Sequence, residues 1–151
     1  MTKLVQPKLT KAISGIMKPP ADPVRISTLG REQLIKLKRQ TGIANWNILC
    51  RWALCCSLRE KSTPPRAIAG GDAGVEIAWK VFAGEHAETY TALVYNRAAS
   101  DGFTESDGLS NCLRAHLHRG LGYLASETGN PEITGFLERW LMNRRPDKTR
   151  N

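Results

Sequence analysis

The segment from Val24 to Glu60 constrains the fold of this chain most strongly, because it contains three successive patterns that each predict a different element. The first, Val24 to Ser27, alternates apolar and polar side chains, which is typical of a short strand with one buried face. A strand of this length is not stable alone in water. We therefore expect it to pair with another strand, and the expected partner is the same segment of a second subunit.

An amphipathic helix is predicted directly after this strand. Ser27 or Thr28 can cap its N-terminus, because a hydroxyl oxygen at that position accepts a hydrogen bond from a free backbone N–H. Gly42 is typical of the left-handed residue that follows the end of a helix. The side chains predicted to form the buried stripe of this helix are Leu34, Leu37 and Thr41.

A second helix, predicted from Asn45 to Glu60, is apolar on nearly all sides. Because it has no wide polar face, it is predicted to be a core helix or a contact between subunits. The order of strand, basic helix, glycine turn and buried helix is that of a ribbon-helix-helix unit, whose paired strands enter a DNA groove. This likeness concerns the fold and does not by itself assign a function.

The net charge of +8 is concentrated in the first part of the chain. Residues 1–61 contain 12 Lys and Arg against 3 Asp and Glu, whereas residues 62–151 contain 10 against 11. A basic helix face can serve solubility alone, but its concentration around a strand-helix unit favours an anionic polymer as the partner. If the strands pair in a groove, Arg25 and Ser27 are placed to read bases. The residues predicted to contact DNA are Arg25, Arg31, Lys36, Lys38 and Arg39.

The whole chain is predicted to form a mainly helical α+β protein, with one domain over residues 24–144. Residues 1–23 form a basic arm rich in Lys and Pro, and residues 145–151 form a polar tail. The further elements expected in the domain are a linker at 61–74, a strand at 75–82, and helices at 85–101, 104–127 and 131–143.

Two of these helices carry informative glycines. The segment 85–101 also fits an alternating strand, but Gly102 stands where a helix C-cap belongs and favours the helix. Within 104–127, Gly120 and Gly122 weaken the helix and can allow close approach of another backbone.

No constellation of side chains predicts a catalytic centre, a metal site or a cofactor site. The four cysteines, Cys50, Cys55, Cys56 and Cys112, match neither a CxxC pair nor a zinc ribbon, so buried free thiols in a reducing compartment are expected. His116 and His118 are two positions apart and face different ways on a helix. We expect core or surface histidines, although His118 with Arg119 could contact a phosphate.

The sequence also predicts a cytoplasmic location. It contains no apolar run of about 18 residues that could span a membrane. Its first twenty residues lack the continuous apolar run of a signal peptide.

Three segments in order resemble the DndE family of DNA sulfur-modification proteins: VRIS…REQLIKLKRQTGI…NILCRWALCCSLRE, VEIAWKVFAGEH and HLHRGLGYLA. The resemblance covers Val24 to Ala125. It implies a small, non-catalytic subunit of the bacterial phosphorothioation machinery that acts with other proteins of the sulfur-modification system. It further implies a mainly helical homotetramer that binds double-stranded DNA, with nicked DNA preferred, through lysines and arginines. Among the basic residues between Arg25 and Arg51, it adds Arg51 to the candidates.

Two alternatives stay open from the residues alone. The strand-helix-helix order fits a sequence-specific transcriptional repressor or antitoxin of the ribbon-helix-helix type. The cysteine-rich helix also admits a sulfur carrier that uses Cys50, Cys55 or Cys56. The oligomeric state and the choice between sequence-specific and structure-specific DNA recognition are not fixed by the sequence.

Overall fold

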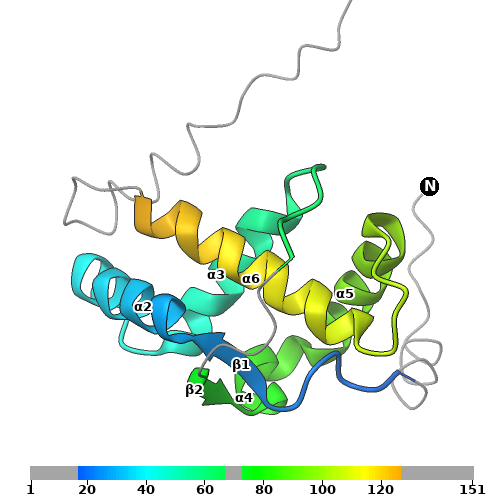
Figure 1. The fold of residues 1–151 in the computed structure, drawn as a ribbon. Coiled ribbons are helices and arrows are strands. Elements are labelled where there is room, and N and C mark those ends of the chain that lie inside the picture. Colours follow the sequence, from blue (N-terminus) through cyan, green and yellow to red (C-terminus); the bar gives the residue numbers. More distant parts are fainter. Residues whose placement is uncertain (1–16, 67–72, 127–151) are drawn as a thin grey trace, which may run out of the picture.

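The computed structural model of the protein describes residues 17–66 and 73–126. Most of the predicted arm, part of the linker, the helix expected at 131–143 and the tail lie outside the described residues. Within them, the fold is a small helical assembly with one two-stranded sheet (Figure 1), as the prediction of a mainly helical α+β protein requires. None of the described helices is long and apolar enough to cross a membrane.

The strand and the first helix begin and end close to their predicted bounds. Strand β1 runs from Val24 to Ser27 and helix α2 from Thr28 to Thr41. Ser27 is the cap, because its Oγ accepts a hydrogen bond from the backbone N–H of Gly30 at 3.1 Å. Gly42 ends α2 in the left-handed conformation, with a φ of 71°. The predicted stripe of Leu34, Leu37 and Thr41 is buried.

The partner of β1 differs from the one expected. It is β2, Ala73–Ile77 of the same chain, in antiparallel register that places Arg25 opposite Glu76 and Ile26 opposite Val75. The chain therefore supplies the second strand that β1 needs, and the expectation of an intersubunit ribbon was wrong for this pairing.

The strand expected at 75–82 is shorter and begins earlier, because its second half is helical. Helix α4 runs from Trp79 to Ala83 and is followed by the 3₁₀ turn η1, Gly84–His86. Trp79 and Phe82 are both buried and stack with ring centroids 5.5 Å apart, whereas Val81 is 55% exposed. A three-residue spacing brings the two rings onto one face of a helix, and alternation along a strand would have separated them.

The core lies between helices α3, Trp46–Leu58, and α6, Gly108–Ser126, which cross at the centre of the molecule (Figure 1). A Cβ built on Gly120 of α6 would lie 1.8 Å from the backbone oxygen of Ala53. The predicted close approach at Gly120 is thus confirmed, whereas a Cβ on Gly122 would meet no atom closer than 4.0 Å. Helix α3 is therefore a core helix, which is one of the two roles predicted for it, the other being a contact between subunits.

Helix α5, Ala87–Asp101, packs against α6 and ends at Gly102, which has a φ of 78°. The helical reading of this segment is confirmed. Helix α6 begins four residues later than expected, because residues 104–107 form a turn in which the N–H of Gly108 donates to the backbone oxygen of Glu105. Gly108 packs directly on Phe103, whose backbone oxygen would lie 2.4 Å from an added Cβ.

Candidate nucleic-acid interface

The corner between β1 and α2 is fixed by a histidine of α6. The backbone N–H of Ser27 donates to Nε2 of His118 at 3.1 Å, and Nδ1 of His118 donates to the backbone oxygen of Arg114 at 2.7 Å. This arrangement requires the neutral ring with its proton on Nδ1. Burial accordingly lowers the pKa of His118. The expectation that His118 could contact a phosphate was wrong, because both of its ring nitrogens are used inside the protein.

Five of the six cations predicted to contact DNA are exposed on β1 and α2, and four of these, Arg25, Arg31, Lys38 and Arg39, make no hydrogen bond to a backbone oxygen among the described residues. Helix α2 carries four cations and a single acid, Glu32. Because Leu34 and Leu37 face the core, Arg31 and Lys38 lie along one flank of the buried stripe, and Arg39 lies further toward solvent. The structure therefore places three of these side chains on one stretch of exposed helix.

Arg25 is held by a neighbour across the sheet. Its Nε lies 3.1 Å from Oε1 of Glu76, the residue opposite it in the register, and the two side chains are 63% and 48% exposed. An exposed pair of this kind contributes only about 0–1 kcal/mol, so it can be exchanged for another anion.

The remaining two predicted cations make structural contacts. Nζ of Lys36 donates to the backbone oxygen of Ala125 at 2.9 Å, near the end of α6. Nη1 of Arg51 donates to the backbone oxygen of Phe82 at 3.2 Å, near the end of α4. Lys36 remains exposed at the edge of the basic stretch, but Arg51 is partly buried on a different helix.

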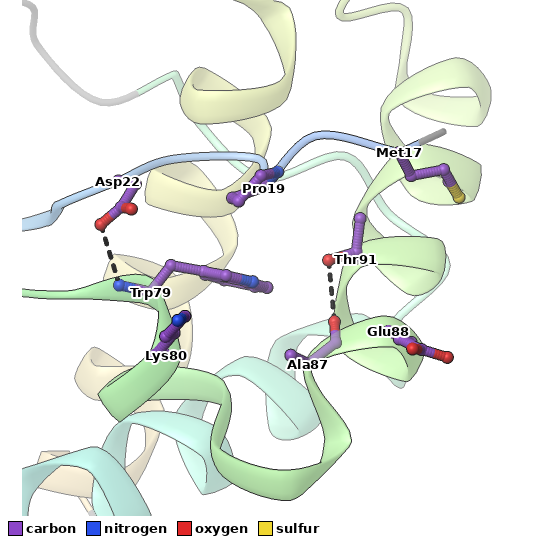
Figure 2. Close-up of a pocket in the computed structure, with 8 residues that line it drawn as sticks. All are labelled: Met17, Pro19, Asp22, Trp79, Lys80, Ala87, Glu88 and Thr91. Carbon is purple, nitrogen blue, oxygen red and sulfur yellow. Dashed lines mark hydrogen bonds between the residues drawn. The ribbon is translucent and has the colours of Figure 1, made fainter. Parts of the chain in front are cut away.

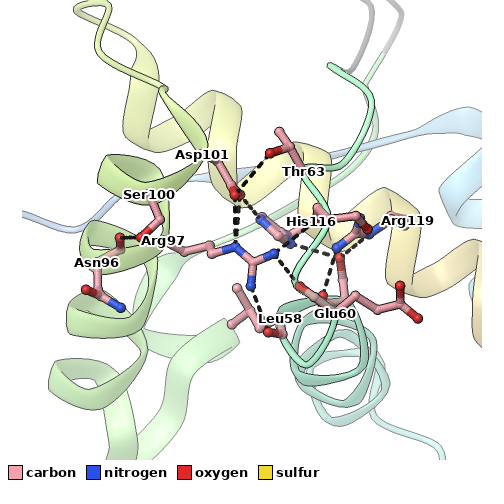
Figure 3. A network of polar contacts seen from close by, with 11 residues as sticks. Leu58, Glu60, Thr63, Asn96, Arg97, Ser100, Asp101, His116 and Arg119 are labelled. Carbon is pink, nitrogen blue, oxygen red and sulfur yellow. Dashed lines mark hydrogen bonds and ion pairs between the residues drawn. The ribbon is translucent and has the colours of Figure 1, made fainter. Parts of the chain in front are cut away.

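A buried polar network lies between α3, α5 and α6 (Figure 3). At its centre, Nε2 of His116 lies 2.8 Å from Oδ2 of Asp101, and Nδ1 lies 2.8 Å from Oγ of Ser57. Nε of Arg97 donates to the carboxylate of Asp101, and Nε of Arg119 donates to Oγ of Ser57. Oγ of Ser57 accepts a hydrogen bond from Arg119, so the Ser57 hydroxyl is able to donate its proton to Nδ1 of His116. Nε2 of His116 then carries the ring proton and donates it to Asp101.

The network fixes the chain that follows α3. Arg97 donates to the backbone oxygens of Leu58, Glu60 and Ser62. Arg119 donates to the backbone oxygens of Ser57 and Ser62. The two guanidinium groups thus satisfy carbonyls left free at the end of α3. Arg119, which the sequence suggested for a phosphate, is engaged here instead.

Sequence reasoning missed this network, although part of it had a signal. Arg97 and Asp101 are four residues apart on one helix, a spacing that brings opposite charges together. The link to Ser57 had no such signal, because it joins residues 59 apart in sequence. Burial lowers the pKa of His116, and the hydrogen bonds from His116 and Arg97 outweigh desolvation to lower that of Asp101.

Asp101, His116 and Cys112 also bring three ligand atoms within 4.8 Å of one another. Two features oppose an ion between them. Arg97 already supplies a positive charge to Asp101, at 3.0 Å. Burial raises the pKa of the Cys112 thiol to about 12, whereas metal ligation requires the thiolate.

The other thiols share this inert character. Cys50 and Cys56 are buried, and burial raises the pKa of Cys50 to about 12. Cys55 is exposed, but its pKa is also raised, chiefly by desolvation. None of the four cysteines forms a disulfide, as predicted, but the expectation that all four are buried was wrong for Cys55.

A hollow of about 260 Å³ lies beside α4 and α5 (Figure 2). Two of its polar side chains bond to the protein itself: Oδ1 of Asp22 accepts from the N–H of Trp79 at 3.1 Å, and Oγ1 of Thr91 donates to the backbone oxygen of Ala87 at 2.8 Å. Trp79 and Met17 give the hollow apolar walls. Lys80 and Glu88, which carry opposite charges, also line it, so it offers no concentration of positive charge.

The comparison with protein families identifies the family of this chain. The family model described as DNA sulphur modification protein DndE matches residues 23–130, which is more than half of the chain. The chain belongs to the DndE family. Membership gives this DndE-family protein a role in the DNA sulfur-modification system and confirms the resemblance seen in the sequence. No curated protein matches the sequence.

Proposed function

We propose that this DndE-family protein is a non-catalytic, cytoplasmic DNA-binding subunit of the sulfur-modification system. It binds double-stranded DNA, with nicked duplex preferred, through the basic surface of a homotetramer, and it works beside other proteins of that system. The observation that carries the proposal is the exposed stretch of β1 and α2 with Arg25, Arg31, Lys38 and Arg39.

The exposed cations favour contacts with the DNA backbone. Within α2, Glu32 is the single acid among four cations, so the helix retains a positive field. Lys and Arg on a helix neutralise phosphates and release counterions without reading sequence. A nick interrupts one strand and makes the duplex easier to bend, so a surface that follows the backbone gains contacts there.

The position of β1 supports this proposal over a ribbon-helix-helix repressor. In such repressors the strands of two subunits pair and enter a groove together. Here β1 pairs with β2 of its own chain, and the N–H of Ser27 is taken by His118.

The buried chemistry supports a non-catalytic role. Ser57, His116 and Asp101 are linked by hydrogen bonds, but Ser57 and His116 are 0% exposed. A nucleophile must meet its substrate, and these atoms instead satisfy one another. The sulfur-carrier alternative is opposed by the burial of Cys50 and Cys56 and by the raised pKa values of Cys50 and Cys55.

Assembly into a homotetramer is supported by apolar surface that the single chain leaves uncovered. Leu29 of α2 is 63% exposed and Val81 of α4 is 55% exposed. Trp46 and Ile48 of α3 are only half-buried. Apolar surface of this kind is the usual material of a subunit contact.

The test combines native mass with DNA titration. We expect a native mass of four chains and binding to a duplex of scrambled sequence. A triple variant with Arg31, Lys38 and Arg39 changed to Ala is expected to bind at least 100-fold more weakly at low salt and to keep its fold and native mass. A variant with Thr104, Ser106 and Asp107 changed to Ala controls for general effects of surface substitution. Equal binding by the triple variant and the wild type would refute the proposed surface.

A further inference from the structure

A second hollow, of about 350 Å³, lies between the start of β1 and the first two turns of α6. Residues 21–25 form one wall, and Ser110, Asn111, Leu113 and Arg114 form the other. None of these four α6 residues was among the predicted DNA contacts. In contrast to the hollow beside α4 and α5, this one contains two arginines, Arg25 and Arg114.

The side chain of Arg114 has one buried N–H group without a hydrogen-bond acceptor among the described residues. Its Nε is shielded from solvent and has no hydrogen-bond partner among the described residues. By comparison, Nε of Arg97 and Nε of Arg119 each have an acceptor at about 3 Å. A buried donor without an acceptor is unfavourable, and it marks a position where an external acceptor would be stabilised.

Arg25 supplies a second positive charge in the same hollow. Its only described partner, Glu76, is itself half-exposed, so the guanidinium can turn to a ligand at little cost. Ser110 and Asn111 add neutral donors, since their present hydrogen bonds are long, both 3.4 Å. Asp22 is the one acid in the lining, and its Oδ1 accepts from the N–H of Trp79.

We propose that this hollow binds a phosphate group of DNA between Arg114 and Arg25. The inference rests on the proposed function and deepens it, because it extends the DNA surface from β1 and α2 onto α6. A planar guanidinium can grip two oxygens of one phosphate, and a turn of the Arg114 side chain would bring its shielded Nε to such a ligand. The phosphate comes either from a continuous backbone or from the 5′ end of a broken strand.

The test measures dissociation constants of the full-length protein for three duplexes of one scrambled sequence. One is intact, one carries a nick with a 5′-phosphate, and one carries a nick with a 5′-hydroxyl. We expect Arg114→Gln to weaken binding about 10- to 100-fold, the range for loss of a charged bidentate contact. The control, Lys61→Gln, removes the same charge from an exposed position in the chain that follows α3.

The three duplexes separate the two sources of the phosphate. A loss confined to the 5′-phosphorylated nick identifies the strand end as the ligand, and an equal loss for all three identifies a backbone phosphate. Because Nε of Arg114 has no bond to lose, the variant should melt within a few degrees of the wild type. A much lower melting temperature would show that Arg114 is structural and would overturn the site.

The remaining outcomes separate this inference from the proposed function. If the wild type binds DNA and Arg114→Gln binds it equally well, the phosphate site is refuted and the DNA-binding function stands. If the wild type binds none of the three duplexes, the proposed function fails and the site fails with it.

Discussion

Gly120 of α6 passes so close to Ala53 of α3 that an added Cβ would lie 1.8 Å from the Ala53 backbone oxygen. Neither atom is the end of a flexible side chain, so the two helix backbones would have to separate. The packing of α3 on α6, which forms the centre of the core, therefore depends on the absence of a side chain at position 120.

We predict that Gly120→Ala destabilises the protein by about 1–3 kcal/mol or more, because about 1–3 kcal/mol is the usual cost of overpacking a core. Gly122→Ala is the matched control on the same helix, because a Cβ there would meet only the end of the Gln33 side chain, at 4.0 Å. The Gly122→Ala variant should have a free energy of unfolding equal to that of the wild type or higher by up to about 1 kcal/mol, since alanine favours the helix. Chemical denaturation of both variants makes the comparison, and equal stabilities would contradict the close crossing.

The buried pair of Arg97 and Asp101 gives a second prediction. The two side chains are 14% and 3% exposed, and Arg97 also donates to three backbone oxygens at and beyond the end of α3. Arg97→Ala should cost about 3–5 kcal/mol, because it leaves Asp101 as a buried charge without its cation. Arg97→Lys should recover only part of this loss, since an ammonium cannot reproduce the fork of contacts. Thermal melting measures both, and a fully stable Ala variant would refute the role of the network.

Stability should also fall in mildly acidic solution. Burial lowers the folded-state pKa values of His116 and His118 below their ordinary value of 6.5, so the unfolded chain takes up protons first. The histidine contribution to stability is complete above about pH 6.5 and is lost as the pH falls through the folded pKa values. The pKa of Asp101 is also lowered, but its contribution persists down to about its ordinary value of 3.8.

The measurement is the free energy of unfolding between about pH 8 and about pH 5. His118→Gln should reduce the pH dependence, because its amide oxygen can accept from Ser27 but does not titrate. A free energy that stays constant or rises toward pH 5 would contradict the neutral, internally bonded histidines.

Lys36 and Arg51 should behave differently from the other predicted DNA contacts. Each donates to a backbone oxygen, of Ala125 and Phe82 respectively. We expect Lys36→Ala and Arg51→Ala to lower stability by about 1.5–3 kcal/mol, the range for a charged hydrogen bond. Lys38→Ala should leave stability unchanged and make the salt dependence of DNA binding shallower by about 0.9 per lost phosphate contact. Unfolding curves and binding at several salt concentrations separate the two groups.

The parts of the fold that the sequence predicted well are those set by local chemistry. Ser27 and Gly42 mark the two ends of α2 by their capping geometry, and Gly102 marks the end of α5 in the same way. The parts predicted incorrectly depend on distant partners. Trp79 begins a helix because it is buried with Phe82 beside Asp22, 57 residues earlier in the sequence. The contact with Asp22 is not visible in the local sequence, although the three-residue spacing of Trp79 and Phe82 is.

The candidate site shows the same division. Exposure of Arg31, Lys38 and Arg39 followed from the helical period, since they lie away from Leu34 and Leu37. Arg114 could not be found this way, because it joins the surface only through the packing of α6 beside β1. The internal roles of Arg51 and Arg119 were hidden for the same reason, since their acceptors are 31 or more residues away.

The most direct measurement compares the affinity of the full-length protein for nicked and intact duplexes of two unrelated sequences. A surface built from backbone-binding cations should bind the nicked form of either sequence more tightly than the intact form. It should also distinguish little between the two sequences. Strong preference for one sequence regardless of the nick, or no binding to any of the four duplexes, would contradict the account.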